Sequence, residues 1–230
     1  MFRSTTTSSA LSALTALAVA GCSSSTEPVG TSAPSSGPAY HGGSTSSASV
    51  LLSSAELNKR LLNESDLGEG YTREPEPALR HDDVMVIGCP ALEKLGSDAA
   101  TGSGLEFPRK AEASFAYADN NSEVAEELYS DAEAKLSKGV SRIFEAMSSC
   151  PRYQVLVGST PVTVTTRKLP APTLGEERWS QLLTVTVGGR RSVVKQTAVR
   201  TGTVVVVVSG SAALVDAHVA KATDKVHGMG

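Results

Sequence analysis

Five consecutive valines, Val204–Val208, constrain the fold more than any other feature of this 230-residue sequence. β-branched side chains favour strands, and successive residues of a strand point to opposite faces of its sheet. A run that is apolar at every position therefore has to be buried on both faces. At a sheet edge such a run would be an aggregation site. The valines predict a central strand in a sheet that is covered on both sides.

The segments before the valines predict an antiparallel meander. Residues 179–187 and 192–200 are rich in strand-forming residues, and Gly188-Gly189 separates them as a tight hairpin turn. Thr201-Gly202 plays the same part between the second run and the valines. Residues 123–129 fit either an edge strand or a helical turn. Other segments with strand patterns are residues 111–118, 153–157 and 162–167.

Helical periodicity supplies the cover for this sheet. Residues 131–150 place Leu136, Val140 and Phe144 on one face, and residues 212–226 repeat Val215 and Val219 in the same way. Ser53 and Glu56 have the spacing of a capping box, which predicts a further helix from Ser54. The expected fold is α+β: an antiparallel sheet of about five to six strands covered by two or three helices, an α/β sandwich.

The N-terminus has the organisation of an export signal. A short polar start is followed by a weakly apolar run, Ala10–Ala20, which is too short to span a membrane. The next residues, Val19-Ala20-Gly21-Cys22, resemble the lipobox of bacterial lipoproteins. The resemblance implies that residues 1–21 are a signal peptide and that Cys22 carries diacylglycerol and acyl chains such as palmitate. The alternative is an ordinary secretory signal with an incidental cysteine.

A tether follows the expected anchor. Residues 23–49 consist mostly of Ser, Thr, Gly, Pro and Ala, and Glu27 is their only charge. Such a segment buries too little apolar surface to fold. The predicted organisation is therefore a signal peptide (1–21), a lipidated cysteine with a flexible tether (22–50), and one α+β domain (51–230). The protein is expected on the outer face of the cell membrane.

Charge and cysteine content further narrow the class of protein to which this sequence can belong. The net charge is −3, and Lys and Arg form no block, which argues against nucleic acid as a partner. Once Cys22 is assigned to the anchor, Cys89 and Cys150 remain. In an oxidising compartment the simplest prediction is that these two form a disulfide. A thiol pair that binds metal is the alternative, but further ligands at useful spacing are missing.

The candidate chemical motifs are weak. Ser192–Lys195 matches S-x-x-K, but the two residues lie in a strand pattern, where positions three apart face opposite ways. His81-Asp82-Asp83 would need additional ligands to hold a metal ion. Glu176 and Glu177 could act as a proton-transfer pair or simply mark a turn, and His218 is expected to be a packed side chain. We expect no catalytic residue, no metal site and no cofactor.

Several features stand out between residues 51 and 226: Cys89-Pro90, the strand around Phe115, the helix that ends at Ser149-Cys150, Leu174–Glu177, and Val199–Gly202 before the valine strand. In this order they resemble actinobacterial sensor-type lipoproteins related to the extracellular domain of PknH-like receptor kinases. The resemblance implies an α/β sandwich with a cleft that receives a ligand. The kinase domains also have a second disulfide and tryptophans near the helix end, which this sequence lacks.

These observations predict a membrane-anchored lipoprotein whose domain senses or binds a ligand without catalysing a reaction. The expected partners are the membrane, reached through the diacylglyceryl anchor, and a small molecule, a lipid or an envelope protein. An alternative is a carrier of lipids or cell-wall intermediates. A hydrolase would require acids such as Glu176 or Glu177 to meet a histidine in a pocket.

Overall fold

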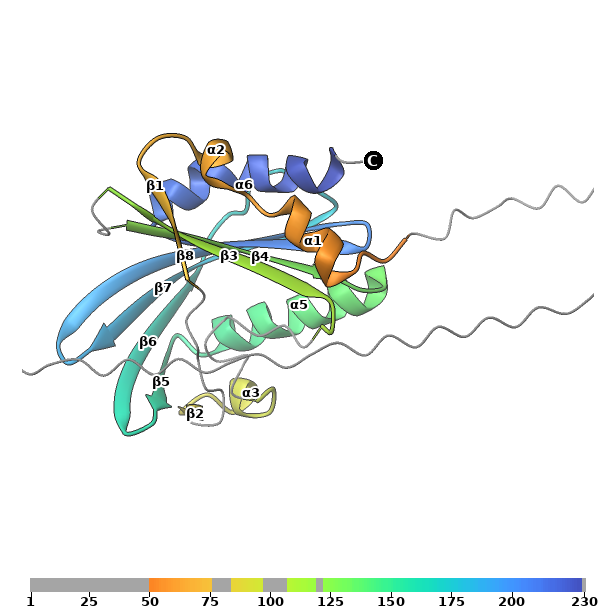
Figure 1. Ribbon diagram of the computed structural model, residues 1–230. Helices are drawn as coiled ribbons and strands as arrows, with labels where there is room; N and C mark the ends of the chain where they lie inside the picture. Colours follow the sequence, from red (N-terminus) through yellow and green to blue (C-terminus); the bar gives the residue numbers. More distant parts are fainter. Residues whose placement is uncertain (1–49, 76–83, 97–106, 119–121, 229–230) are drawn as a thin grey trace, which may run out of the picture. The chain divides into compact units, whose positions relative to one another are not determined.

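The valine run forms strand β9 (Val204–Gly210) in the middle of a nine-stranded antiparallel sheet (Figure 1). The strand order is β1-β3-β4-β9-β8-β7-β6-β5-β2, so three strands lie on one side of β9 and five on the other. The structure is a computed structural model, and it describes residues 50–75, 84–96, 107–118 and 122–228.

Strands on both sides of β9 and the helices that cover them make up the rest of the described chain. The strands are β1 (Tyr71–Glu74), β2 (Val84–Ile87), β3 (Lys110–Tyr117), β4 (Ser122–Ser130), β5 (Arg152–Val157), β6 (Thr160–Lys168), β7 (Glu177–Val187) and β8 (Arg190–Thr201). The helices are α1 (Ser54–Arg60), α2 (Glu64–Leu67), α3 (Pro90–Glu93), α5 (Glu133–Ser149) and α6 (Ala212–His227).

The predicted mixture of sheet and helices is confirmed, but the expected five to six strands were too few. Two of the additional strands, β1 and β2, have only four residues each and lie at opposite edges of the sheet. β4 escaped a firm prediction because its three glutamates hide the apolar pattern. It is a strand between β3 and β9, neither an edge strand nor a helical turn.

The predicted burial of the valine strand on both faces is confirmed. Val204, Val206 and Val208 lie in one core with residues of α1 and α6, whereas Val205 and Val207 lie in another core. That second core is built with residues of α5. Helices α1, α2 and α6 therefore cover one side of the sheet, the α6 face, and α3 and α5 cover the other, the α5 face (Figure 1).

A disulfide closes the α5 face. The predicted bond between Cys89 and Cys150 is present, with 5.7 Å between the Cα atoms. It joins the start of α3 to the end of α5 above a third core that includes Met147 and Tyr153. Every described element, all three cores and the disulfide belong to one compact unit, Ser46–Gly230. This segment thus contains the contacts it needs to fold.

The predicted turns and cap are also found. Gly188 and Gly189 have φ angles of 54° and 81° in the hairpin between β7 and β8, and Gly202 has 52° in the hairpin before β9. These angles favour glycine. At the start of α1, the Ser53 hydroxyl accepts from the Glu56 amide and the Glu56 carboxylate accepts from the Ser53 amide. No helix in the described parts of the chain is long and apolar enough to cross a membrane.

Candidate functional site: a buried carboxylate beneath the first two helices

The N-terminal arm, residues 51–67, lies on the α6 face and carries α1 and α2. Its leucines at positions 52, 57, 61, 62 and 67 are all buried in the core of that face. A second capping box shapes its end, because Asn63 Oδ1 accepts from the Asp66 amide at 3.0 Å and Asp66 Oδ2 accepts from the Asn63 amide at 3.0 Å. The cap holds the Asp66 carboxylate beside α6.

Beneath the arm, β4 contributes a buried acid. Val124 and Leu128 lie on the α6 face of β4, and the alternation of the strand directs Glu126, which lies between them, to the same face. Glu126 is only 1% exposed. The Leu62 amide donates to its Oε2 at 2.5 Å, while its Oε1 is buried and has no hydrogen-bond partner among the described residues.

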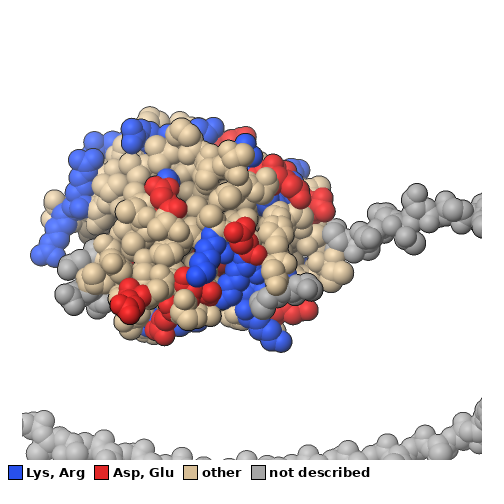
Figure 2. All heavy atoms as spheres, turned by 90° about the horizontal axis from the view of Figure 1, so that it is seen from above, with Lys and Arg blue, Asp and Glu red and all other residues tan. Residues whose placement is uncertain are grey.

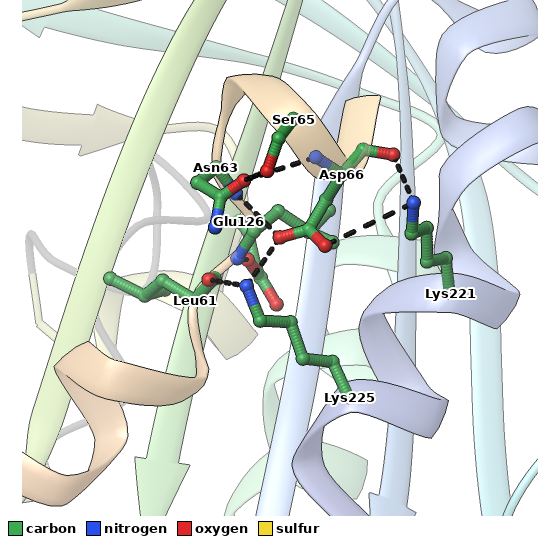
Figure 3. A network of polar contacts seen from close by, with 8 residues as sticks. Leu61, Asn63, Ser65, Asp66, Glu126, Lys221 and Lys225 are labelled. Atoms are coloured by element: carbon green, nitrogen blue, oxygen red, sulfur yellow. Dashed lines mark hydrogen bonds and ion pairs between the residues drawn. The ribbon is translucent and has the colours of Figure 1, made fainter. Parts of the chain in front are cut away.

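Two lysines of α6 complete the network (Figure 3). Lys225 Nζ donates to the Leu61 carbonyl at 2.7 Å and forms an ion pair with Asp66. Lys221 Nζ lies 3.9 Å from Asp66 Oδ1 and also donates to the Asp66 carbonyl. The network therefore connects the arm to α6 through charged groups and to β4 through Glu126.

This environment shifts the pKa values of Glu126 and Asp66 in opposite directions. Burial raises the pKa of Glu126 to about 7; the Leu62 amide and the charge of Lys225 oppose this, and the negative charge of Asp66 adds to it. Burial also acts to raise the pKa of Asp66, but the hydrogen bonds from Lys225 and Asn63 and the two lysine charges together lower it. Near neutral pH, Asp66 is therefore charged, whereas Glu126 is present in both its protonated and its charged form.

This arrangement can bind a proton and accept one more hydrogen bond. The group that donates to Glu126 is a backbone amide, not a serine, cysteine or histidine side chain that an acid could activate. Glu127, on the α5 face of the same strand, is a second acid of this kind. Burial raises its pKa to about 7, although the Tyr129 hydroxyl donates to it.

The structure gives Glu176 and Glu177 a different partner from the histidine that a hydrolase would need. Arg200 Nη1 lies 2.7 Å from Glu176 Oε2, and Arg200 Nη2 lies 2.7 Å from Glu177 Oε1. The Gly202 amide also donates to Glu176 at 3.0 Å. The two acids fasten the start of β7 to the end of β8, next to the β8–β9 hairpin.

The S-x-x-K match lies in a strand, as expected. Ser192 and Lys195 both belong to β8, where three-residue spacing directs side chains to opposite faces, and Lys195 pairs with Asp216 of α6.

The histidines of α6 have tyrosine and threonine partners. His218 is buried, and its Nε2 is hydrogen-bonded to the Tyr71 hydroxyl at 2.6 Å; burial, with the charge of Lys221, lowers its pKa. His227, one residue beyond the predicted helix 212–226, is the last residue of α6, and it is hydrogen-bonded to Thr201 Oγ1 at 2.7 Å.

Other predicted positions, Cys22 and residues 81–83, lie outside the described residues. Within the described part of the chain, no group of three or more His, Cys, Asp or Glu side chains could hold a metal ion. Sequence reasoning missed the Glu126 network altogether. Its one available signal was a charged residue between Val124 and Leu128, two apolar positions of the same strand face.

The fold matches that of an extracellular domain of known structure. The crystal structure of the extracellular domain of PknH from Mycobacterium tuberculosis superimposes with a TM-score of 0.58 at 14% sequence identity. The match covers 78% of this chain and 99% of that one. No family model and no curated protein matches the sequence. The predicted PknH-like fold is therefore confirmed, and at this identity the likeness concerns the fold alone.

Proposed function

We propose that this chain is a membrane-anchored, extracytoplasmic lipoprotein whose domain senses or binds a ligand without catalysing a reaction. The observation that carries the proposal is the likeness of its fold to almost the whole of an extracellular receptor-kinase domain. The lipobox-like sequence that ends at Cys22 supplies the location. The ligand would be a small molecule, a lipid or an envelope protein, and the diacylglyceryl group would be the contact with the membrane.

The partners of the acidic side chains support binding over chemistry. Glu176 and Glu177 are held by Arg200, and Glu126 accepts from a backbone amide. An acid that activates a nucleophile needs that group within hydrogen-bond reach. These acids instead join segments that are distant in sequence.

The anchor is tested by replacing the cysteine. The full chain is expressed in a bacterial host that processes lipoproteins, either unchanged, with Cys22→Ser, or with Ser23→Ala as the matched control. We expect the unchanged chain and the control in the membrane fraction, labelled by a palmitate analogue. Cys22→Ser should lose the label and leave the membrane fraction, because one thiol carries the lipid. Membrane retention and labelling that survive Cys22→Ser would contradict the anchor.

The second part of the proposal concerns what the domain carries. The segment 46–230 is purified with its disulfide intact and examined by native mass spectrometry. A protein free of bound lipid, which is then stabilised by an added envelope component, fits a sensor. A copurifying lipid that resists exchange would favour the alternative function, a carrier of lipids or cell-wall intermediates.

A further inference from the structure

No described helix covers the α6 face over the outer half of the sheet. α6 packs against β9, β8 and β4, and the arm packs against β3 and β4, so these helices cover the strands on one side of the molecule. On β2, β5, β6, β7 and the first half of β8 the same face carries exposed side chains. We call this surface the open face and define it by Met85, Ile87, Arg152, Arg167, Arg191 and Val193.

Strand register places these side chains on one face of the sheet. Val84 and Val86 of β2 pack into the core on the α5 face, so Met85 and Ile87 point the other way. Across the sheet, Arg152 pairs with Thr165, Thr165 with Thr184, and Thr184 with Val193. The row therefore runs without interruption from β5 to β8.

Apolar side chains on the open face lie in water. Met85 is 61% exposed, Ile87 42% and Val193 47%. Single exposed apolar residues are ordinary, but these three share one face with the half-buried Leu156 and Leu182. A surface of this kind on a monomer marks a contact site.

Positively charged side chains lie on the same face as these apolar residues. Arg152, Arg167 and Arg191 are exposed and form no ion pair within the described part of the chain. Strands β2, β5, β6 and β8 contain no Asp or Glu, and the one acid of β7, Glu177, binds Arg200 on the α5 face. Figure 2 shows Lys and Arg gathered at its upper left, at the end where β5–β8 lie in Figure 1.

We propose that the open face docks the domain onto the anionic surface of a lipid bilayer. Arginines without an ion pair among the described residues, on the same face as exposed apolar side chains, match a partner that presents phosphates above a hydrocarbon layer. A soluble polyanion would engage the arginines but leave Met85, Ile87 and Val193 in water. This docking goes beyond the lipid anchor proposed above. It does not depend on Cys22, so experiments can refute either proposal without refuting the other.

The test is co-sedimentation of the oxidised segment 46–230 with lipid vesicles. We expect binding to an equimolar mixture of phosphatidylglycerol and phosphatidylcholine, little binding to phosphatidylcholine alone, and weakening as salt is raised from about 0.05 to about 0.3 M. Each cation near an anionic surface strengthens binding about fivefold. The variant Arg152→Gln/Arg167→Gln should therefore bind about 25-fold more weakly.

A matched pair separates docking from net charge. Lys138 and Arg142 are exposed on α5, across the sheet from the open face. The variant Lys138→Gln/Arg142→Gln makes the same change in net charge and should bind within about twofold of the unchanged segment. Equal losses in the two double variants would overturn the proposal, because binding would then follow net charge alone.

A third variant distinguishes a bilayer from a soluble polyanion. Met85→Gln/Val193→Thr keeps every charge and should weaken vesicle binding by about tenfold, because apolar contact is lost. Circular dichroism and the thermal midpoint verify that each variant is folded. The lipid assignment fails if this variant binds as the unchanged segment does. It fails equally if heparin competes fully and phosphatidylglycerol gives no advantage.

Discussion

At the scale of single residues, Glu126 is one of the groups that make stability depend on pH. Burial raises its pKa to about 7, whereas the unfolded carboxyl titrates near 4.5. Between these values the folded chain binds more protons than the unfolded chain, so the free energy of unfolding decreases as pH rises through that window. The pKa of Glu127 is also raised, so this residue changes the free energy of unfolding with pH in the same direction. His218 has the opposite effect on the free energy of unfolding, because its lowered pKa makes the folded state lose stability as pH falls.

Replacing Glu126 with Gln isolates the contribution of this residue to the pH dependence of the free energy of unfolding. The amide oxygen can still accept from Leu62, but the side chain no longer acquires a charge on deprotonation. We expect Glu126→Gln to raise the free energy of unfolding at pH 8 by about 2–3 kcal/mol and to leave it nearly unchanged at pH 4.5. Urea unfolding of segment 46–230, measured from pH 4.5 to 8, checks this expectation.

The control for this prediction lies on the same strand. Glu123 of β4 is exposed, and Glu123→Gln should leave the free energy of unfolding nearly unchanged throughout the pH range. If the unchanged segment and Glu126→Gln gave parallel curves of stability against pH, Glu126 would have to titrate like an exposed carboxyl.

Residue-level prediction from the sequence succeeded where a residue type has one dominant use. The two cysteines left after Cys22, Cys89 and Cys150, predicted a single disulfide, and Ser53 with Glu56 had the local spacing of a helix cap. Glu126 could not be found in this way. Its burial depends on the arm folding back over β4, a contact between residues 64 positions apart that leaves no local pattern.

At the scale of elements, local pattern predicted the long segments and failed on the short ones. α5 and α6 have a clear helical periodicity and β9 is a run of β-branched residues, and the structure confirms all three. β1 and β2 are too short to show alternation, and their pairing with β3 and β5 is decided by tertiary contacts. Intrinsic strand preference is weak compared with such contacts.

The disulfide links two elements, and its contribution to the free energy of unfolding can be measured by removing it. It closes a loop with a sequence separation of 61 residues between α3 and the end of α5. On the chain-entropy model, which is debated, this closure stabilises the folded state by about 4 kcal/mol. We expect Cys89→Ala/Cys150→Ala to lower the free energy of unfolding of segment 46–230 by about that amount, as measured by urea unfolding.

Reduction provides the matching control. Dithiothreitol should destabilise the unchanged segment and have no effect on the double variant, which lacks both thiols. Segment 46–230 excludes Cys22, so its denatured, unreduced form should show no free thiol. Two titratable thiols in freshly exported protein would mean that the bond is absent in the cell.

At the scale of the whole molecule, the N-terminal arm belongs to the domain as fully as the sheet does. The leucines at positions 52, 57, 61, 62 and 67 are buried in the core that β9 and α6 share. Hydrogen bonds add to this burial: the Leu52 amide donates to Ser130, and Arg60 donates to the Val226 carbonyl. Residues 51–67 are therefore part of the folded domain, and its exact start remains a prediction.

Shortening the chain from this end tests the boundary. Burying a leucine stabilises by roughly 1.5–3 kcal/mol, so five leucines contribute roughly 8–15 kcal/mol, which is comparable with the roughly 5–15 kcal/mol that stabilises a whole domain. We expect segment 46–230 to unfold cooperatively and segment 70–230 to lack a cooperative transition and to bind a hydrophobic dye. Thermal unfolding followed by near-ultraviolet circular dichroism measures both. An equal midpoint for the two segments would mean that the core of the α6 face is closed without the arm, and that the arm, with its network around Glu126, is an accessory to a domain that begins at β1.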